Sequence, residues 1–236
     1  MILLERVELV PRYDFDPQAW YLDIPVVAEL RDNGIDFTHP VTVVVGENGS
    51  GKSTLLEGVA AAWAASLGAA KDPMWSPGTS AEDTDLGRHL ACTGPQPRPT
   101  NGCFLRAEAM HGLFDSADRN RVRATDQAFN QLSHGQSFLH YVAERPVGQG
   151  LWILDEPEAA LSFQSCLALL GVLKDLADEG SQVIMATHSP LLAACPDADI
   201  WELTDDGVDY PDWAELELVA NWRAFLDEPQ RYLRHL

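Results

Sequence analysis

Short apolar runs that alternate with helical segments set the pattern of this chain. Val41–Val45 is a continuous β-branched run, as expected for a strand buried on both faces of a parallel sheet. Leu151–Leu154 and Val183–Thr187 are further short apolar runs. Helical composition fills Ser53–Leu67 and Pro157–Glu179. This alternation predicts an α/β domain with a mainly parallel central sheet.

The remaining segments predict smaller elements around that sheet. In the first forty residues, short apolar runs alternate with turn residues, which predicts antiparallel strands at an edge. Residues 71–101 are rich in proline, glycine and polar residues, which predicts a long loop or a weakly structured insertion. The expected smaller elements are strands at Val7–Val10, Ile24–Val27, residues 103–110, Ile200–Leu203 and Val208–Tyr210, and an amphipathic helix at Ala214–Leu226.

Composition narrows the class of partner. The 236 residues include 16 basic and 36 acidic ones, for a net charge of -20. Such a surface repels phosphate backbones and anionic lipids, so charge does not support DNA binding, although a basic groove formed on dimerisation stays compatible with it. The four cysteines show no C-x-x-C spacing, as in a reduced cytosolic protein. The longest small-apolar run, residues 58–70, is too short to cross a bilayer. These features predict a cytoplasmic protein without direct membrane insertion.

The strongest chemical motif is GENGSGKS, residues 46–53, which fits G-x-x-x-x-G-K-[ST] at every fixed position. Its glycines allow backbone conformations in which successive N–H groups turn inward around phosphates. The following helix directs its positive end at the same place. Lys52 would reach the β- and γ-phosphates, and the Ser53 hydroxyl would ligate Mg²⁺.

A second motif, LWILDEPEAALS, places two adjacent carboxylates at the end of an apolar strand. Phosphoryl transfer needs one acid to hold the magnesium shell and another near the attacking water. Asp155 suits the first role and Glu156 the second. An apolar run that ends in Asp-Glu is common on its own. The motif indicates phosphoryl transfer only because the glycine loop occurs in the same chain.

Two further segments could line the same site. LSHGQS, residues 132–137, offers Ser133 and a glycine where a helix could begin, and such a start can bind an anion. VIMATHSP, residues 183–190, delivers His188 to the carboxyl end of a strand, where ligands of open α/β sheets gather. In isolation, Ser133 is more simply a helix cap and His188 a solvated loop histidine.

Together these segments resemble the ATP-binding-cassette (ABC) ATPases. Gly46–Thr54 is similar to the Walker A loop, Leu132–Gln136 to the signature motif, Leu151–Glu156 to Walker B with its catalytic glutamate, and His188 to the switch histidine. The resemblance implies ATP and Mg²⁺ as ligands. It implies that the nucleotide is held by Glu47, Asn48, Gly49, Ser50, Gly51, Lys52, Ser53 and Thr54.

The same resemblance implies a homodimer that forms on ATP binding. In this family, two subunits pack head to tail, so that the signature motif of one caps the γ-phosphate held by the other. Ser133, Gly135 and Gln136 would then act in trans, Glu156 would polarise water, and His188 would sense the γ-phosphate. Hydrolysis would release the dimer.

The sequence departs from the usual family pattern at several positions. His134 replaces the first signature glycine, and Ser162 stands where the D-loop has an aspartate. Glu108 occupies the expected place of the Q-loop glutamine, where it could hold a magnesium-bound water. No aromatic residue is an obvious platform for adenine, and Tyr13 and Tyr21 are the candidates.

The motifs are closest to small soluble cassette ATPases often named AAA-family ATPases, which are relatives of chromosome-maintenance and double-strand-break-repair ATPases. That implies a P-loop NTPase fold of the ABC type, with a mainly parallel sheet, an antiparallel edge subdomain and a helical insertion. Residues 1–236 would form one domain, with about 70–140 as the insertion that carries the signature motif.

Three roles remain open at this point. The first is an ATPase that switches an unknown protein partner or a DNA-associated process. The second is the nucleotide-binding subunit of a membrane transporter, which Glu108 and the proline-rich stretch before it make less favourable. The third, a sensor that does not hydrolyse ATP, conflicts with the presence of Glu156. The basic cluster Arg119, Arg121 and Arg123 could touch DNA, but a solvated helix face accounts for it more simply.

Overall fold

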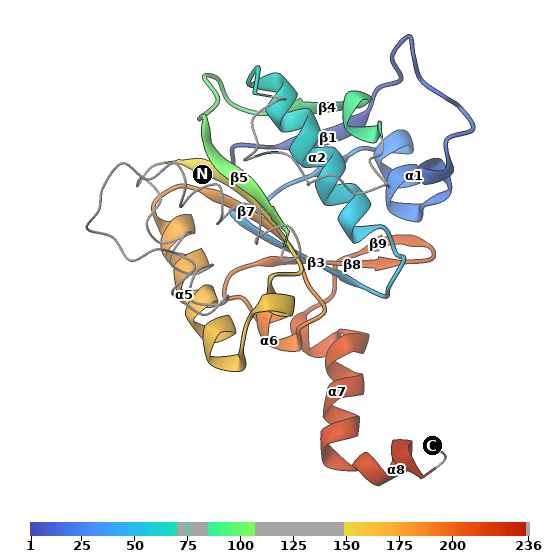
Figure 1. Cartoon of the computed structure of the whole chain (residues 1–236), viewed down its shortest axis with the longest axis vertical. Helices are drawn as coiled ribbons and strands as arrows, with labels where there is room; N and C mark the ends of the chain where they lie inside the picture. Colours follow the sequence, from blue (N-terminus) through green and yellow to red (C-terminus); the bar gives the residue numbers. More distant parts are fainter. Residues whose placement is uncertain (70–74, 76–84, 107–148, 235–236) are drawn as a thin grey trace.

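A six-stranded sheet forms the centre of the protein (Figure 1). The computed structural model describes residues 1–69, 75, 85–106 and 149–234. The strand order is β5-β6-β7-β3-β8-β9, in which the first five strands are parallel and β9 pairs antiparallel with β8. The strands are β3 (Val41–Gly46), β5 (Asn101–Arg106), β6 (Gly150–Asp155), β7 (Gln182–Ala186), β8 (Asp199–Thr204) and β9 (Gly207–Asp209). The predicted α/β class and parallel sheet are confirmed.

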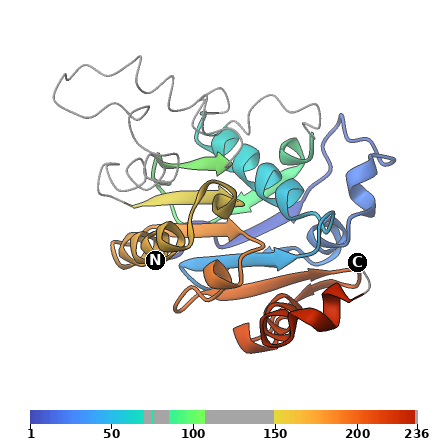
Figure 2. The same ribbon diagram turned by 60° about the horizontal axis from the view of Figure 1, so that its bottom comes forward.

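Helices cover both faces of this sheet, which is why its central strands are continuous apolar runs. Along β3, Val44 packs into one core, while Val43 and Val45 pack into the other. In Figure 2, α2 lies across one face, and α5 and α6 lie across the opposite face. The helices are α1 (Pro25–Asp32), α2 (Lys52–Ser66), α5 (Phe163–Asp178), α6 (Pro190–Ala193), α7 (Glu217–Asp227) and α8 (Pro229–Leu233), with 3-10 turns at Trp20–Asp23, Leu86–Arg88, Pro157–Ala160 and Trp213–Glu215.

A small antiparallel sheet, in the order β2-β1-β4, packs beside α2. Its strands are β1 (Arg6–Leu9), β2 (Ile35–Asp36) and β4 (Leu90–Thr93). The buried Gln182 at the start of β7 ties the N-terminal segment to the main sheet. Its side-chain oxygen accepts from the backbone N–H groups of Leu3 and Leu4 at 2.8 and 2.7 Å, and its amide donates to the Leu4 carbonyl at 3.0 Å. These bonds satisfy backbone N–H and C=O groups of Leu3 and Leu4, which would otherwise be buried without hydrogen-bond partners.

Two element predictions were wrong. Residues 24–27 begin α1 instead of a strand, because Pro25 sets the φ angle of a first helical residue and needs no hydrogen-bonded N–H. Val26, Val27 and Leu30 then fall on the buried side of that helix. Residues 71–101, predicted as a loop or insertion, contain β4. This strand pairs with β1, which lies far away in the sequence. Residues 90–106 thus supply strands to both sheets. The predicted insertion at about 70–140 stays a prediction.

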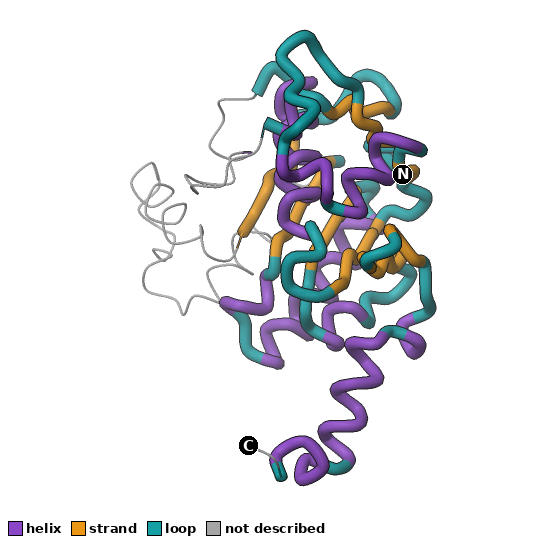
Figure 3. Tube along the Cα trace, turned by 90° about the vertical axis from the view of Figure 1, so that its right-hand side faces the viewer, coloured by secondary structure: helices purple, strands orange, loops and turns teal. Residues whose placement is uncertain are grey.

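The C-terminal helices α7 and α8 run away from the rest of the chain (Figures 1 and 3). Val219 is the buried residue of α7, whereas Trp222 and Leu226 are exposed. Within the described ranges, none of the helices has both the length and the apolar composition needed to cross a membrane.

Substitution of Gly102 tests the pairing between β5 and β6. A Cβ at this position would lie 1.9 Å from the Leu151 carbonyl oxygen, and the φ of +121° is one that L side chains rarely adopt. Gly102→Ala should therefore lower the free energy of unfolding by about 3 kcal/mol, because strand β5 must move off β6. Urea unfolding measures this change.

The matched control is Gly171→Ala in α5, where an added Cβ would meet nothing within 4 Å. That change should be neutral or stabilise the protein by up to about 1 kcal/mol, because alanine is the better helix former. Equal losses in the two variants would contradict the assigned pairing.

Candidate functional site

The glycine loop joins the buried strand β3 to α2 at the carboxyl edge of the sheet. Gly51 is the N-cap residue of α2 and has a φ of +96°. An added Cβ at Gly51 would lie 2.4 Å from Cγ2 of Ile24. Both the backbone conformation and the packing therefore require glycine here. The consequence is a helix N-terminus that opens directly onto the loop, as an anion-binding loop needs.

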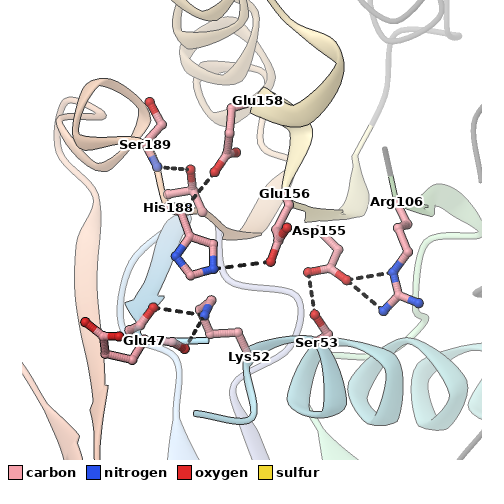
Figure 4. A network of polar contacts seen from close by, with 11 residues as sticks. Glu47, Lys52, Ser53, Arg106, Asp155, Glu156, Glu158, His188 and Ser189 are labelled. Atoms are coloured by element: carbon pink, nitrogen blue, oxygen red, sulfur yellow. Dashed lines mark hydrogen bonds and ion pairs between the residues drawn. The ribbon is translucent and has the colours of Figure 1, made fainter. Parts of the chain in front are cut away.

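Lys52 is buried and is held by the loop itself. Its Nζ donates to the carbonyl oxygens of Gly46 and Glu47, each at 2.9 Å (Figure 4). Desolvation lowers the pKa of Lys52, and the nearby carboxylates of Glu156 and Asp155 oppose that shift. The buried Ser50 hydroxyl has no hydrogen-bond partner among the described residues. An unpartnered buried hydroxyl in the loop fits a site built to receive a polar ligand.

Asp155 ends β6 and is almost fully buried, at 1% exposure. One of its carboxylate oxygens, Oδ1, accepts from the Ser53 hydroxyl at 3.2 Å. The other, Oδ2, accepts from Nε of Arg106 at 2.9 Å. Three elements, α2, β5 and β6, thus meet at this carboxylate (Figure 4).

Glu156 follows directly, with its backbone in the left-handed region at a φ of 50°. A non-glycine residue in this region costs roughly 1–3 kcal/mol and tends to occur at functional sites. Its N–H donates to the Ala186 carbonyl at 3.0 Å, which fixes the turn against β7. The carboxylate Oε1 lies 3.3 Å from Nε2 of His188, close enough for an ion pair when the imidazole is protonated.

The chemistry of the donors fits a magnesium ion. Ser53 Oγ and Asp155 Oδ1 are hard oxygen atoms that lie side by side. Across the described ranges there is no group of three His, Cys, Asp or Glu side chains that could hold a metal ion alone. Magnesium typically takes one or two protein oxygens and completes its shell with waters and substrate phosphates, so a sparse donor set is the expected one.

The structure brings together one part of the predicted site. Residues 47–54 lie in the loop and the first turn of α2, and Asp155, Glu156 and His188 lie at the ends of β6 and β7. Glu108, Ser133, Gly135 and Gln136 lie outside the described residues, as does His134. Their predicted roles stay predictions.

Tyr21 cannot serve as the adenine platform considered from the sequence. Its side chain is buried at 2% exposure, and its hydroxyl donates to Asp85 at 2.7 Å. Tyr13 is fully exposed.

Two family models match parts of the chain. One, described as an AAA domain, matches residues 27–83, which include the glycine loop. The other, described as an AAA domain and linked in its description to the AbiEii toxin of a type IV TA system, matches residues 127–194, which include Asp155, Glu156 and His188. The two halves of the site thus fall in two matches to AAA domains.

Similar proteins carry the ABC name. A Streptomyces coelicolor protein with the provisional name ABC transporter ATP-binding protein is 30% identical over 171 residues, which are 64% of this chain and 29% of that relative. Together with the two AAA-domain matches, this similarity supports the predicted small ABC-type ATPase. The chain spans less than a third of the length of this relative.

Two further similarities are more limited. UvrABC system protein A of Xanthomonas axonopodis pv. citri is 46% identical over 48 residues, or 20% of this chain and 5% of that protein. The predicted kinship with repair ATPases therefore stays a prediction. Among solved structures, cbiO1 of Clostridium perfringens, part of the ABC transporter complex cbiONQ, is 16% identical, covers 99% of each chain and has a TM-score of 0.49.

A cleft of about 540 Å³ is lined by residues of the glycine loop and of α7. Its lining includes Gly46–Ser50, His188, Glu202, Asn221 and Trp222. The sequence indicated an amphipathic helix here but gave no sign that it borders the loop, because that contact depends on how β8 and α7 are placed next to β3.

Glu158 is a residue of the site that the motif analysis missed. One carboxylate oxygen accepts from the backbone N–H of His188 at 2.5 Å, and the other is buried without a hydrogen-bond partner among the described residues. The available signal was an acid in the turn that follows Asp155-Glu156. Glu158 thus connects the turn after β6 to the loop that carries His188 (Figure 4).

Glu158→Gln tests this connection. The amide can still accept from the His188 N–H, but the charge-assisted bond becomes a neutral one, which is roughly half as strong. We expect nucleotide hydrolysis to fall about tenfold while nucleotide affinity changes little, because the phosphate loop is not touched. Steady-state kinetics with the kcat and KM effects separated provide the measurement.

Ser162→Ala is the control, since Ser162 lies in the same segment but caps α5. It should cost about 1 kcal/mol of stability without an equal loss of turnover. A Glu158→Gln enzyme with unchanged kcat would contradict the positioning of His188.

Proposed function

We propose that this domain binds ATP with Mg²⁺ and hydrolyses it to ADP and phosphate. The observation that carries the proposal is the convergence of Lys52, Asp155, Glu156 and His188 at one edge of the sheet, beside a glycine loop that opens a helix. Such a loop cradles phosphates through its N–H groups, and the adjacent acids suit phosphoryl transfer to water. Family membership supports the coarser statement that this is a nucleotide-binding ATPase domain.

Lys52 would exchange partners when the nucleotide binds. In the structure, its ammonium group donates to two carbonyl oxygens of the loop. The phosphates would offer charged acceptors, which form stronger hydrogen bonds than carbonyl groups. Burial lowers the pKa of Lys52, and the negative carboxylates of Glu156 and Asp155 oppose that shift. Residues 48–54 would surround the phosphates with backbone N–H groups and the Ser50 and Thr54 hydroxyls.

Glu156 would act as the general base on the attacking water, and His188 would contact the γ-phosphate. The distance of 3.3 Å between Glu156 Oε1 and His188 Nε2 supports a shared site for these two roles. Asp155 and Ser53 would hold the magnesium ion, which neutralises charge on the β- and γ-phosphates when it is bound. Glu108 would hold one of its waters, as proposed from the family resemblance.

The dimer belongs to the same proposal. Ser133, Gly135 and Gln136 of a second copy would close over the nucleotide, and hydrolysis would open the dimer and so switch a partner protein. The family resemblance supports this step. The exposed loop edge also supports it, because Glu156 and His188 keep 42% and 33% of their side-chain surface accessible. The cytoplasm, where ATP is supplied, is the proposed location.

Calorimetric titration of the whole chain tests nucleotide binding. ATP and ADP should bind in the presence of Mg²⁺, whereas adenosine, which lacks phosphates, should not bind measurably. Release of inorganic phosphate then tests turnover. Equal affinity for adenosine and ATP would show that the loop does not cradle phosphates, and the proposal would fall.

The name of the Streptomyces relative favours a second candidate, the nucleotide-binding subunit of a membrane transporter. In that case, the proposed switch would act on a membrane-embedded partner. Capture from detergent-solubilised membranes with a tagged Glu156→Gln chain tests it. A multi-spanning membrane protein retained only with Mg-ATP supports the transporter role, and retention of soluble proteins alone contradicts it.

A further inference from the structure

Arg106 connects two buried carboxylates beside the phosphate loop (Figure 4). It ends β5 and is paired in register with Asp155 at the end of β6. Its guanidinium forms ion pairs with Asp155 and with Glu57. The side-chain exposures of Arg106, Glu57 and Asp155 are 15%, 11% and 2%, so solvent screens these ion pairs weakly.

The position of Glu57 follows from helix geometry. Glu57 lies four residues after Ser53 in α2, so both side chains lie on the same face of the helix. That face meets the ends of β5 and β6, where Ser53 contacts Asp155 and Glu57 contacts Arg106. The result is a connected set of four side chains from three elements.

The two oxygens of Asp155 are divided between different partners. Nε and Nη2 of Arg106 lie 2.9 and 2.8 Å from Oδ2. Oδ1 faces Ser53 Oγ at 3.2 Å. The arginine therefore fixes the plane of the carboxylate without covering the oxygen that adjoins the Ser53 hydroxyl.

We propose that Arg106, anchored by Glu57, is a positioning residue that holds Asp155 so that Oδ1 and Ser53 stay together as a magnesium-binding pair. This inference rests on the proposed function. Partners of this kind orient metal ligands, and their loss typically costs about 10–100-fold in metal affinity. A carboxylate with one oxygen fixed and one available suits a small ion that binds single oxygens in an octahedral shell.

Charge alone predicts the opposite result, which makes the inference testable. A guanidinium near a cation site repels the cation, so if Arg106 acted only through charge, its removal would tighten Mg²⁺ binding. Replacement by lysine would then change little, because the charge is kept. If Arg106 positions Asp155, both changes weaken Mg²⁺ binding, because lysine lacks the planar pair of donors that reaches one oxygen and a second carboxylate together.

The experiment titrates Mg²⁺ into the whole chain with a fluorescent ATP analogue bound, and repeats the nucleotide titration in EDTA. For Arg106→Lys and Arg106→Gln, the Mg²⁺ concentration at half-maximal effect should rise about 10–100-fold. Nucleotide affinity in EDTA should change little. Glu57→Gln, which keeps an acceptor for Arg106 but removes the charge of the anchor, should shift the Mg²⁺ requirement in the same direction by less.

Arg98→Gln is the matched control. Arg98 is also partly buried, but it packs over Trp63 and donates to the Cys92 carbonyl, away from the loop. It should leave the Mg²⁺ requirement unchanged. Thermal unfolding without nucleotide shows which variants are folded. If Arg106→Gln is not folded, the Mg²⁺ requirements of Arg106→Lys and Glu57→Gln test the inference.

An unchanged or lower Mg²⁺ requirement in Arg106→Lys overturns the inference. Equal losses of nucleotide affinity with Mg²⁺ and in EDTA also overturn it, because they indicate a general structural role. The wild-type chain separates this inference from the proposed function. If the wild type binds no nucleotide in either condition, the proposed function fails and the inference fails with it.

Discussion

Glu156→Gln should lower the rate of ATP hydrolysis by about two to four orders of magnitude while ATP stays bound. This range is what a positioned general base typically contributes to a reaction. The change removes the base but keeps the size of the side chain, so the left-handed backbone at this residue and its bond to Ala186 can persist. Phosphate release measures turnover, and retained fluorescent nucleotide measures binding.

The same variant should accumulate a dimer, because the step that opens the dimer is blocked. A sizing column equilibrated with Mg-ATP should show the larger species, and without nucleotide the variant should elute as the smaller one. Glu179→Gln, an acid at the end of α5 remote from the site, is the control and should behave as the wild type. A Glu156→Gln chain that stays monomeric in saturating Mg-ATP would contradict the sandwich mechanism.

Lys52→Ala should weaken ATP binding by about a hundredfold or more. A buried cation that bonds to phosphate oxygens contributes about 1.5–3 kcal/mol for each charged hydrogen bond, so losing two of them is enough for this change. The variant should still fold, since the change removes a buried charge and leaves the helix start to Gly51. Calorimetric titration with ATP measures the affinity.

Lys174→Ala is the corresponding control. Lys174 lies on the exposed side of α5 and pairs with Asp178, so its loss should not alter ATP affinity. Wild-type affinity in Lys52→Ala would contradict the assignment of residues 46–53 as the phosphate cradle. Loss of folding in that variant alone would instead assign Lys52 a structural role.

The central sheet could be predicted from the sequence because buried parallel strands have a local signature. Val41–Val45, Leu151–Leu154 and Val183–Thr187 were found within a residue or two of β3, β6 and β7. The edge sheet could be predicted only in part. The expected strand at Val7–Val10 overlaps β1, whereas β4 was missed because its pattern is set by a partner far away in sequence. Four residues at 90–93 become a strand only because β1 lies beside them.

The same distinction applies to the site. The loop that begins at Gly46 and the Asp155-Glu156 pair can be recognised from residue type and spacing. Glu158 and Arg106 cannot be recognised in this way, because their proposed roles depend on contacts between segments far apart in the sequence. Arg106 lies opposite Asp155 through the register of β5 and β6, which no local spacing of residues encodes.

The bonds of Lys52 to the carbonyl groups of its own loop have a thermodynamic consequence. The two carbonyl oxygens supply acceptors to an ammonium group whose burial without them would be costly. In the proposed function, nucleotide binding would exchange these acceptors for phosphate oxygens, so only the difference between the two sets of bonds would contribute to affinity.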